Sequence, residues 1–278
     1  MNVRELEIAA DRLRLDVLEE IAAAQSGHIG GALSICELLA VLYDKHMNIR
    51  PGEPAWPDRD RLVLSKGHAS SALYAALAAR GYFSRGELQK FRAVDGILQG
   101  HPSMTKTPGV DMSSGSLGQG LSCANGMALA GRIDHKSYQV YCICGDGEMQ
   151  EGQIWEALMT AAHYKLDHLT LFIDRNNLQI DGPTTQVMNM EPLKEKLIAF
   201  GWDTQVIAGH DVSAIDQAIT RAKALRGKPS AIILNTVKGK GVSFMENVAG
   251  WHGTPPDSSQ AAQAREELEA RLKKEEQA

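Results

Sequence analysis

The sequence predicts an α/β fold in which a doubly wound, mainly parallel β-sheet carries helices on both faces. Short apolar runs alternate along the chain with longer segments in which apolar residues recur at helical spacing. The central runs, QVYCIC and LTLFID, are continuously apolar, which is typical of strands buried on both faces of a parallel sheet. No repeat of fixed period is evident, so a solenoid or propeller is not expected.

The helices are predicted from this periodicity. Apolar side chains at Leu6, Leu13, Val17 and Ile21 predict a first helix over 5–24 that ends near Ser26-Gly27, followed by a loop, SGHIGGALS. Further helices are expected at 34–45, 69–80, 117–131, 152–165, 191–200 and 213–225. Strands are expected at 61–64, 139–144, 169–174, 204–208 and 230–236.

The segment after Pro255-Pro256 predicts one more helix, with Asp257 or Ser258 as its N-cap. It contains no residue pattern that indicates chemistry, and we interpret it as a solvated terminal helix or a linker. The expected organisation is therefore one ligand-binding domain over 1–256 and a C-terminal helical tail over 257–278.

Composition excludes several classes of function. The 278 residues include 29 Lys and Arg against 34 Asp and Glu, and this net charge of −5 predicts no general attraction to nucleic acid or to an anionic membrane. No apolar run reaches the roughly 18 residues of a spanning helix, and the N-terminus is amphipathic and unlike a signal peptide. The four cysteines form no C-x-x-C pair. We therefore expect a cytoplasmic protein with no nucleic-acid or membrane partner.

The residues that follow the predicted strands are the candidates for chemistry, because ligands of open parallel sheets bind beyond the carboxyl ends of the strands. Four such segments are expected to face one crevice: Ser65-Lys66-Gly67-His68, Gly145-Asp146-Gly147-Glu148, Arg175-Asn176-Asn177 and Lys238-Gly239-Lys240-Gly241.

Asp146 and Asn176 form the most specific pair in these segments. A lone Gly-Asp-Gly is more often a simple turn. Here, however, one right-handed crossover separates it from Asn176, so both side chains are expected at neighbouring strand tips. Mg²⁺ takes six oxygen ligands, of which Asp146, Asn176 and one main-chain carbonyl would supply half. A diphosphate and a water would supply the rest.

Seven motifs together resemble one enzyme family. GDGEMQEGQIWEA (145–157) and NNLQIDG (176–182) are similar to the thiamine-diphosphate motif of transketolases. The resemblance extends, in family order, through SGHIGGALS, LSKGHASSALY, GHP, SSGSLGQGLS and TVKGKGVSFMEN with WHG. It implies the thiamine-diphosphate-binding fold and the N-terminal, diphosphate-binding subunit of a split transketolase. The implied reaction moves a two-carbon ketol unit from a ketose phosphate to an aldose or aldose phosphate.

The resemblance also implies roles for individual residues. It places Asp146, Asn176 and the main-chain carbonyl of Leu178 on a cation, which is Mg²⁺ or else Ca²⁺ or Mn²⁺. It places Gly147 and Asn176 near the diphosphate of thiamine diphosphate. Further cofactor contacts are implied for His68, Gly115, Ser116, Leu117 and His252.

Three histidines are the implied catalytic residues: His28, His101 and His252 line the sugar channel. Imidazoles titrate near neutrality and can move protons between sugar hydroxyls, and His28 and His252 are the leading candidates for this. The other histidines, which are His46, His135, His163, His168 and His210, are expected to be surface or structural residues.

The resemblance implies a partner chain. In full-length transketolases a second domain supplies the glutamate that protonates the cofactor's aminopyrimidine ring, and no segment after residue 256 offers such a residue. We therefore expect the chain to be inactive by itself and to work with a separately encoded C-terminal subunit, as an α2β2 assembly.

Several alternatives stay open. One is the α subunit of a 2-oxo acid dehydrogenase or another thiamine-diphosphate enzyme, and another is a non-catalytic binding subunit. Glu151 and Glu156 fit a subunit interface and favourable helix-start electrostatics equally well. GSLGQGLSC is no dinucleotide fingerprint, because no strand precedes it. Ile29 and Ala32 depart from the prolines usual in the family's first loop, which leaves the sugar specificity open.

Overall fold

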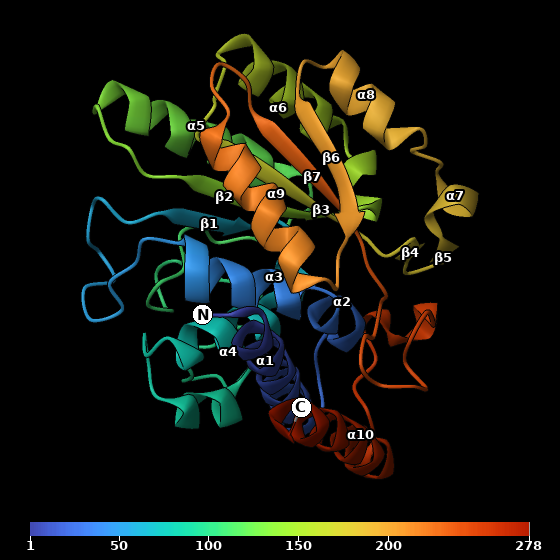
Figure 1. Cartoon of the computed structure of the whole chain (residues 1–278). Coiled ribbons are helices and arrows are strands. Elements are labelled where there is room, and N and C mark those ends of the chain that lie inside the picture. The colour runs from blue at the N-terminus through green and yellow to red at the C-terminus, as the bar shows by residue number, and fades with distance from the viewer. Residues whose placement is uncertain (278) are drawn as a thin grey trace.

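The computed structural model describes residues 1–277 and has a five-stranded sheet with strand order β1-β2-β3-β7-β6 (Figure 1). All of its strand pairs are parallel. The strands are β1 Arg61–Leu64, β2 Val140–Gly145, β3 Leu169–Arg175, β6 Asp203–Ala208 and β7 Ser230–Asn235. The predicted parallel α/β fold and all five predicted strands are confirmed.

The alternation of side chains along β2 and β3 divides the interior into two cores. Tyr141, Ile143 and Phe172 point into the core on one side of the sheet. Cys142 and Cys144 point into the core on the other side, where they are buried as expected. Because both faces of these strands are buried, their sequence is apolar without a polar alternation.

Helices cover both faces of the sheet (Figure 1). The first core is closed by α1 Val3–Ala24, α3 Cys36–Val41, α4 Ser70–Ala79 and α9 Val212–Ala224. The second core is closed by α5 Gln119–Ile133, α6 Gly152–His163 and α8 Leu193–Ala199. Polar residues mark two of the helix starts: Asn2 and Glu5 form a capping box at α1, and Asp211 caps α9.

The prediction of a loop after α1 is partly wrong, because the second half of this segment forms the short helix α2 Ile29–Leu33. Every residue of α2 is buried, so tertiary packing outweighs the low helix propensity of its two glycines. Gly30 is required by close packing, since a Cβ there would lie 2.7 Å from the carbonyl oxygen of Trp251. The next helix starts at Cys36 and ends in a π-helical turn, η1 Leu42–His46.

The periodicity also missed several short elements. They are the hairpin β4 Leu178–Gln179 and β5 Gly182–Pro183, the helix α7 Thr184–Val187, and the 3-10 turns η2 Gly67–Ala69, η3 Arg85–Lys90, η4 Gly147–Gln150 and η5 Ala249–His252. Each has six residues or fewer, which is too short to establish a period.

The tail forms the predicted helix, α10 Ser258–Gln277, with Asp257 as its N-cap. It is not simply solvated, because it packs along α1 and buries Leu268 completely. Arg271 of α10 also pairs with the buried carboxylate of Asp11 in α1 at 2.7 Å. The tail therefore belongs to the same packed body as the first core.

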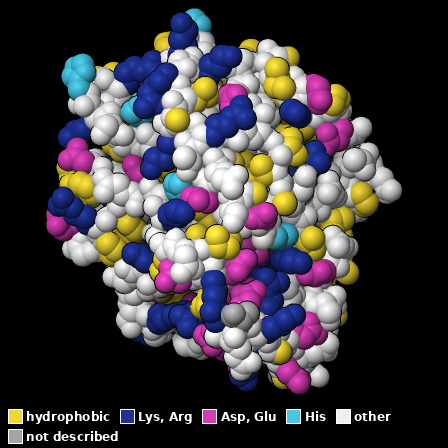
Figure 2. Space-filling model, viewed as in Figure 1, with side chains coloured by type: hydrophobic (Ala, Val, Ile, Leu, Met, Phe, Trp, Pro, Cys, Tyr) yellow, Lys and Arg dark blue, Asp and Glu magenta, His cyan; other side chains and the backbone are white. Residues whose placement is uncertain are grey.

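The surface carries mixed charge. Figure 2 shows Lys and Arg side chains interspersed with Asp and Glu over the viewed face. Within residues 1–277, none of the helices combines the length and the apolar character that crossing a membrane requires.

Candidate active site

A cavity of about 190 Å³ lies at the carboxyl ends of the strands. Residues following β1, β2, β3 and β7 all contribute to its wall, as the sequence predicted. The lining includes Gly31, Lys66, His68, Leu117, Gly145, Asp146, Gly147, Glu148, Asn176, Leu178, Ile180, Lys238 and His252.

Strand register brings Asp146 and Asn176 together. Gly145 of β2 pairs with Asp174 of β3, so the two chains leave the sheet side by side. The Asp146 carboxylate accepts hydrogen bonds from the backbone N–H of Gly147 at 2.9 Å and of Asn177 at 2.6 Å. Asn177 has a φ of +63°, a left-handed conformation that Asn tolerates, and it turns the chain around this carboxylate.

This arrangement suits a cation bound by few protein charges. Within residues 1–277, no group of three or more His, Cys, Asp or Glu side chains is placed to hold a metal. The site expected from the sequence has a single carboxylate, with one amide and the Leu178 carbonyl, and so is not a group of this kind. Burial and the neighbouring charge of Asp174 raise the pKa of Asp146 to about 6, and a bound cation would favour the ionised form.

Four histidines from separate segments converge beside this pair. The ring centroid of His28 lies 5.4 Å from His68, 6.1 Å from His101 and 5.6 Å from His252. The rings of His68 and His252 are 4.9 Å apart. All four histidines selected from the sequence therefore belong to one cluster.

The pKa values of these histidines correct one expectation. Instead of titrating near neutrality, His28 has its pKa lowered to about 4, first by burial and then by Arg92. Burial and the Lys238 charge lower the pKa of His252 to about 3. Burial also lowers the pKa of His68 and His101. In this chain the cluster is therefore neutral at pH 7, able to donate and accept hydrogen bonds without carrying charge.

The 115–117 turn reaches the site only in part. Gly115 packs against His101, since a Cβ on Gly115 would lie 3.0 Å from the imidazole ring. Leu117 lines the cavity, but Ser116 is exposed and is not among the lining residues.

Two buried lysines complete the site. The sequence placed Lys66 and Lys238 after strands but gave them no role. The Lys66 ammonium donates to Asp174 at 2.5 Å and to the Gly31 carbonyl at 2.7 Å. The Lys238 Nζ lies 3.1 Å from Nδ1 of His252, and burial together with the charge of Lys66 lowers the pKa of Lys238 to about 8.

Two carboxylates fix the surrounding segments and were also missed as site residues. Asp174 accepts hydrogen bonds from Ser34 at 2.7 Å, from Asn176 at 3.0 Å and from the Thr236 hydroxyl. Glu148 accepts from the backbone N–H of Gly118 at 2.9 Å and of Gly145 at 3.1 Å. The contacts with Ser34, Thr236 and Gly118 join residues at least 30 positions apart, so no local pattern reveals them.

The remaining candidates lie elsewhere. Three further histidines make structural contacts: His46 pairs with Asp216, His210 with Glu37, and His168 with the Tyr138 carbonyl. Glu156 is exposed on α6. Glu151, the exposed N-cap residue of that helix, makes no capping hydrogen bond and is the exception, because it lines the cavity.

The residues present fit a diphosphate with a divalent cation. Two lysines offer positive charge close to the Asp146 carboxylate, and the glycine at position 31 faces His68 and Lys66 without a side chain. Nδ1 of His28 is buried and has no hydrogen-bond partner. His28 lies beside His68 and His252 of the cavity wall, where a ligand could complete this hydrogen bonding.

Comparison with known proteins identifies the family. Residues 6–275 match the family described as transketolase, thiamine diphosphate binding domain. The chain belongs to the transketolase family. The matched residues include the whole parallel sheet and the helices that connect its strands.

Individual relatives agree with this assignment. The "6-deoxy-6-sulfo-D-fructose transketolase subunit SqwG" of Clostridium sp. strain MSTE9 is 52% identical over 248 residues, covering 89% of this chain and 90% of the relative. One of the subunits of the apulose-4-phosphate transketolase of Phocaeicola vulgatus is 40% identical, covering 99% of this chain and 97% of the relative. The crystal structure of transketolase from Campylobacter jejuni superposes with a TM-score of 0.87 at 32% identity.

Coverage identifies the type of chain. This chain aligns over its full length with 48% of the Campylobacter jejuni transketolase. The two relatives named as subunits match it nearly from end to end. The chain is therefore the diphosphate-binding subunit of a split transketolase, as the motifs predicted, rather than a 2-oxo acid dehydrogenase subunit.

Proposed function

We propose that this chain supplies the cation and diphosphate site of a two-chain transketolase that moves a two-carbon ketol unit from a ketose phosphate to an aldose or aldose phosphate. The convergence of Asp146, Asn176 and two buried lysines at the strand ends is the observation that supports this proposal most strongly.

In this proposal Asp146, Asn176 and the carbonyl of Leu178 hold the cation, which is Mg²⁺, Ca²⁺ or Mn²⁺. Gly147 contacts the diphosphate, and Lys66 and Lys238 offset its charge. Lys238 suits this role because an anion beside it would favour its charged form. His68, Gly115 and Leu117 contact the rest of the cofactor, with Ser116 able to reach it only if the turn moves.

When bound, thiamine diphosphate acts as the electron sink that permits cleavage of the carbon–carbon bond. His28, His101 and His252 then hold the sugar hydroxyls and move their protons. Their lowered pKa values keep them neutral, so each ring can accept a hydrogen bond at one nitrogen, and an anionic ligand beside them would favour uptake of a proton there. The buried Nδ1 of His28 is the atom best placed to gain a partner in this way.

The partner in this proposal is a separately encoded C-terminal subunit in an α2β2 assembly. Exposed apolar side chains near the cavity support such a contact: Leu117 is 38% exposed and Ile180 is 69% exposed. Met188 is 59% exposed, and its carbonyl is bonded to Gln150 of the cavity wall. The exposed Glu151 and Glu156 on α6 extend this proposed interface.

The names of the relatives indicate the chemical class of the donor sugar. Their names give a sulfonated ketose in one case and apulose 4-phosphate in the other. We therefore propose a donor with a terminal anionic group, phosphate or sulfonate. A cytoplasmic location stays a prediction.

Calorimetry tests the proposed function directly. Thiamine diphosphate with Mg²⁺ is titrated into the chain by itself and into its mixture with the product of the neighbouring reading frame. We expect tight binding and ketol transfer only in the mixture, assayed with phosphorylated and sulfonated ketoses in parallel. Robust turnover by the single chain would contradict the two-chain proposal, and no binding in either case would favour a non-catalytic subunit.

A further inference from the structure

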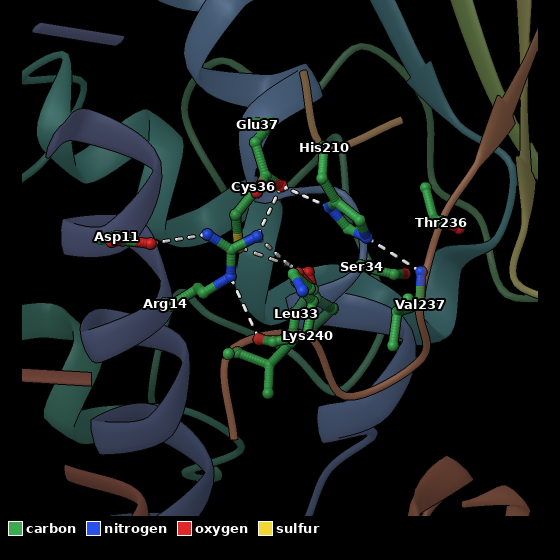
Figure 3. A network of polar contacts seen from close by, with 12 residues as sticks. Asp11, Arg14, Leu33, Ser34, Cys36, Glu37, His210, Thr236, Val237 and Lys240 are labelled. Carbon is green, nitrogen blue, oxygen red and sulfur yellow. Dashed lines mark hydrogen bonds and ion pairs between the residues drawn. The ribbon is translucent and has the colours of Figure 1, made fainter. Parts of the chain in front are cut away.

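The segment Val237–Lys240, which contains Lys238, is held at both of its ends by a buried polar cluster (Figure 3). The backbone N–H of Val237 donates to Nε2 of His210 at 2.9 Å. The carbonyl of Lys240 accepts from Nε of Arg14 at 3.1 Å. Lys238 lies between these two contacts, and its ammonium is 3.1 Å from Nδ1 of His252.

The residues that hold this segment form what we call the Arg14 cluster: Asp11, Arg14, Glu37 and His210 (Figure 3). The Arg14 guanidinium pairs with Glu37 at 2.5 Å and with Asp11 at 2.8 Å. Both carboxylates and the guanidinium are almost completely buried. The cluster therefore connects α1 and α3 to the main chain beside Lys238.

The hydrogen bonds fix the tautomer of His210. A backbone N–H can only donate, so Nε2 accepts from Val237. The ring proton then resides on Nδ1, which lies 3.0 Å from the Glu37 carboxylate. Glu37 in this way orients the imidazole, and the imidazole orients the Thr236–Val237 peptide group, one residue before Lys238.

We propose that His210 is a positioning residue, oriented by Glu37, that sets the place of Lys238 beside His252 and so tunes the binding of the diphosphate cofactor. This inference rests on the proposed function. His210 is outside the residues lining the cavity, so any effect on the cofactor must pass through the Val237–Lys240 segment.

Three substitutions of His210 separate its two contacts. His210→Phe keeps a ring but removes both hydrogen bonds. His210→Asn keeps a donor near the position of Nδ1 for Glu37 but leaves the Val237 N–H without its partner. His210→Gln has the reach to restore an acceptor for Val237. The matched control is His46→Phe, because His46 is also half-buried and paired with a carboxylate, Asp216, away from the cavity.

The chain is mixed with its C-terminal subunit, and the dissociation constant of thiamine diphosphate with Mg²⁺ is measured by calorimetry. We expect His210→Phe and His210→Asn to weaken binding by roughly ten- to one-hundredfold, as for a buried donor left unsatisfied. His210→Gln and His46→Phe should stay within about threefold of the unmodified chain. Urea unfolding of each variant shows whether affinity merely follows stability.

A second measurement places the effect on Lys238. In a Lys238→Met background, His210→Asn should change cofactor affinity by less than about twofold, because the side chain that it positions is gone. Equal loss of affinity with and without Lys238 would overturn the inference, as would normal affinity in both His210→Phe and His210→Asn. Failure of the unmodified pair of subunits to bind the cofactor would instead overturn the proposed function.

Discussion

The Arg14 cluster and the strand-end cavity are both built from buried charged groups, but their charges are balanced differently. In the Arg14 cluster, opposite charges touch. Burial alone raises the pKa of Glu37, yet the Arg14 charge and the His210 hydrogen bond outweigh it and lower the pKa to about 2. In the cavity Lys66 is likewise paired with Asp174, but burial prevails at two other groups: it raises the pKa of Asp146 to about 6 and lowers that of Lys238 to about 8.

The difference separates buried charges that are paired within the chain from buried charges that a ligand would balance. Ion pairs within the Arg14 cluster compensate each other's lost hydration inside the chain. In the cavity, Asp146 forms no ion pair with any Lys, Arg or His of residues 1–277, and Lys238 contacts a neutral imidazole. A cation with a diphosphate would supply the missing charges, so cavity electrostatics should respond to ligands and the Arg14 cluster should not.

The largest effect is expected from breaking the Arg14 cluster. Arg14→Met removes the guanidinium that Asp11 and Glu37 share, leaving Asp11 with Arg271 and Glu37 with no cation, and should lower the free energy of unfolding by about 3–5 kcal/mol. Urea unfolding of the chain measures this loss. The control is Arg132→Met, an exposed arginine bonded to two carbonyl groups, which should cost less than about 1 kcal/mol. Equal losses of unfolding free energy in the two variants would mean that the cluster stabilises the fold no more than an exposed arginine does.

The next effect tests the cavity. Asp146→Ala should weaken metal-dependent cofactor binding by about a hundredfold or more, because the only carboxylate of the proposed cation site is lost. The free energy of unfolding of the metal-free chain should fall by less than the free energy of cofactor binding does, because the removed carboxylate is buried without a cation. Calorimetry and urea unfolding of the same sample give the two values. Unchanged cofactor affinity would remove Asp146 from the site, and Asp134→Ala on the surface serves as control.

A smaller effect should appear on acidification. The pKa of His28 is about 4 in the fold against the ordinary 6.5, so below pH 6.5 the unfolded chain binds the extra proton and the folded chain does not. Stability should therefore fall between pH 6.5 and about 4, by on the order of 1–2 kcal/mol from this group, which is less than the full difference in pKa implies because solvent partly screens this half-buried imidazole. In His28→Asn the dependence of unfolding free energy on pH should be shallower by that amount. The exposed His163→Asn should keep the original slope.

The smallest effect tests whether Lys238 becomes fully charged when the cofactor binds. Near pH 8 this ammonium is partly deprotonated, and an anionic ligand should favour its charged form. Cofactor binding at pH 8 should therefore take up a fraction of one proton, visible as a dependence of the calorimetric enthalpy on buffer ionisation. Lys238→Met should abolish the uptake, and an unchanged uptake would locate the proton elsewhere.

Sequence alone predicted the sheet, its order of elements and the meeting of Asp146 with Asn176, because these depend on local hydrophobic patterns and on general rules of strand crossover. It did not predict α2, where Trp251 and Lys238 pack against Gly30, and His68 and Lys66 pack against Gly31. It also gave no role to the Lys66–Asp174 pair, which joins residues 108 positions apart. Contacts of this kind depend on the folded arrangement and leave no local pattern.

The pairing of Gly145 with Asp174 in the β2–β3 ladder has one further consequence. Side chains alternate between two cores along these strands. A shift of β3 by one residue would therefore turn each of its side chains toward the opposite core, and it would separate Asn176 from Asp146 at the same time. Misaligned chains would thus lose the proposed cation site together with their packing. If that proposal holds, cation binding by the refolded chain would report correct alignment of the two strands.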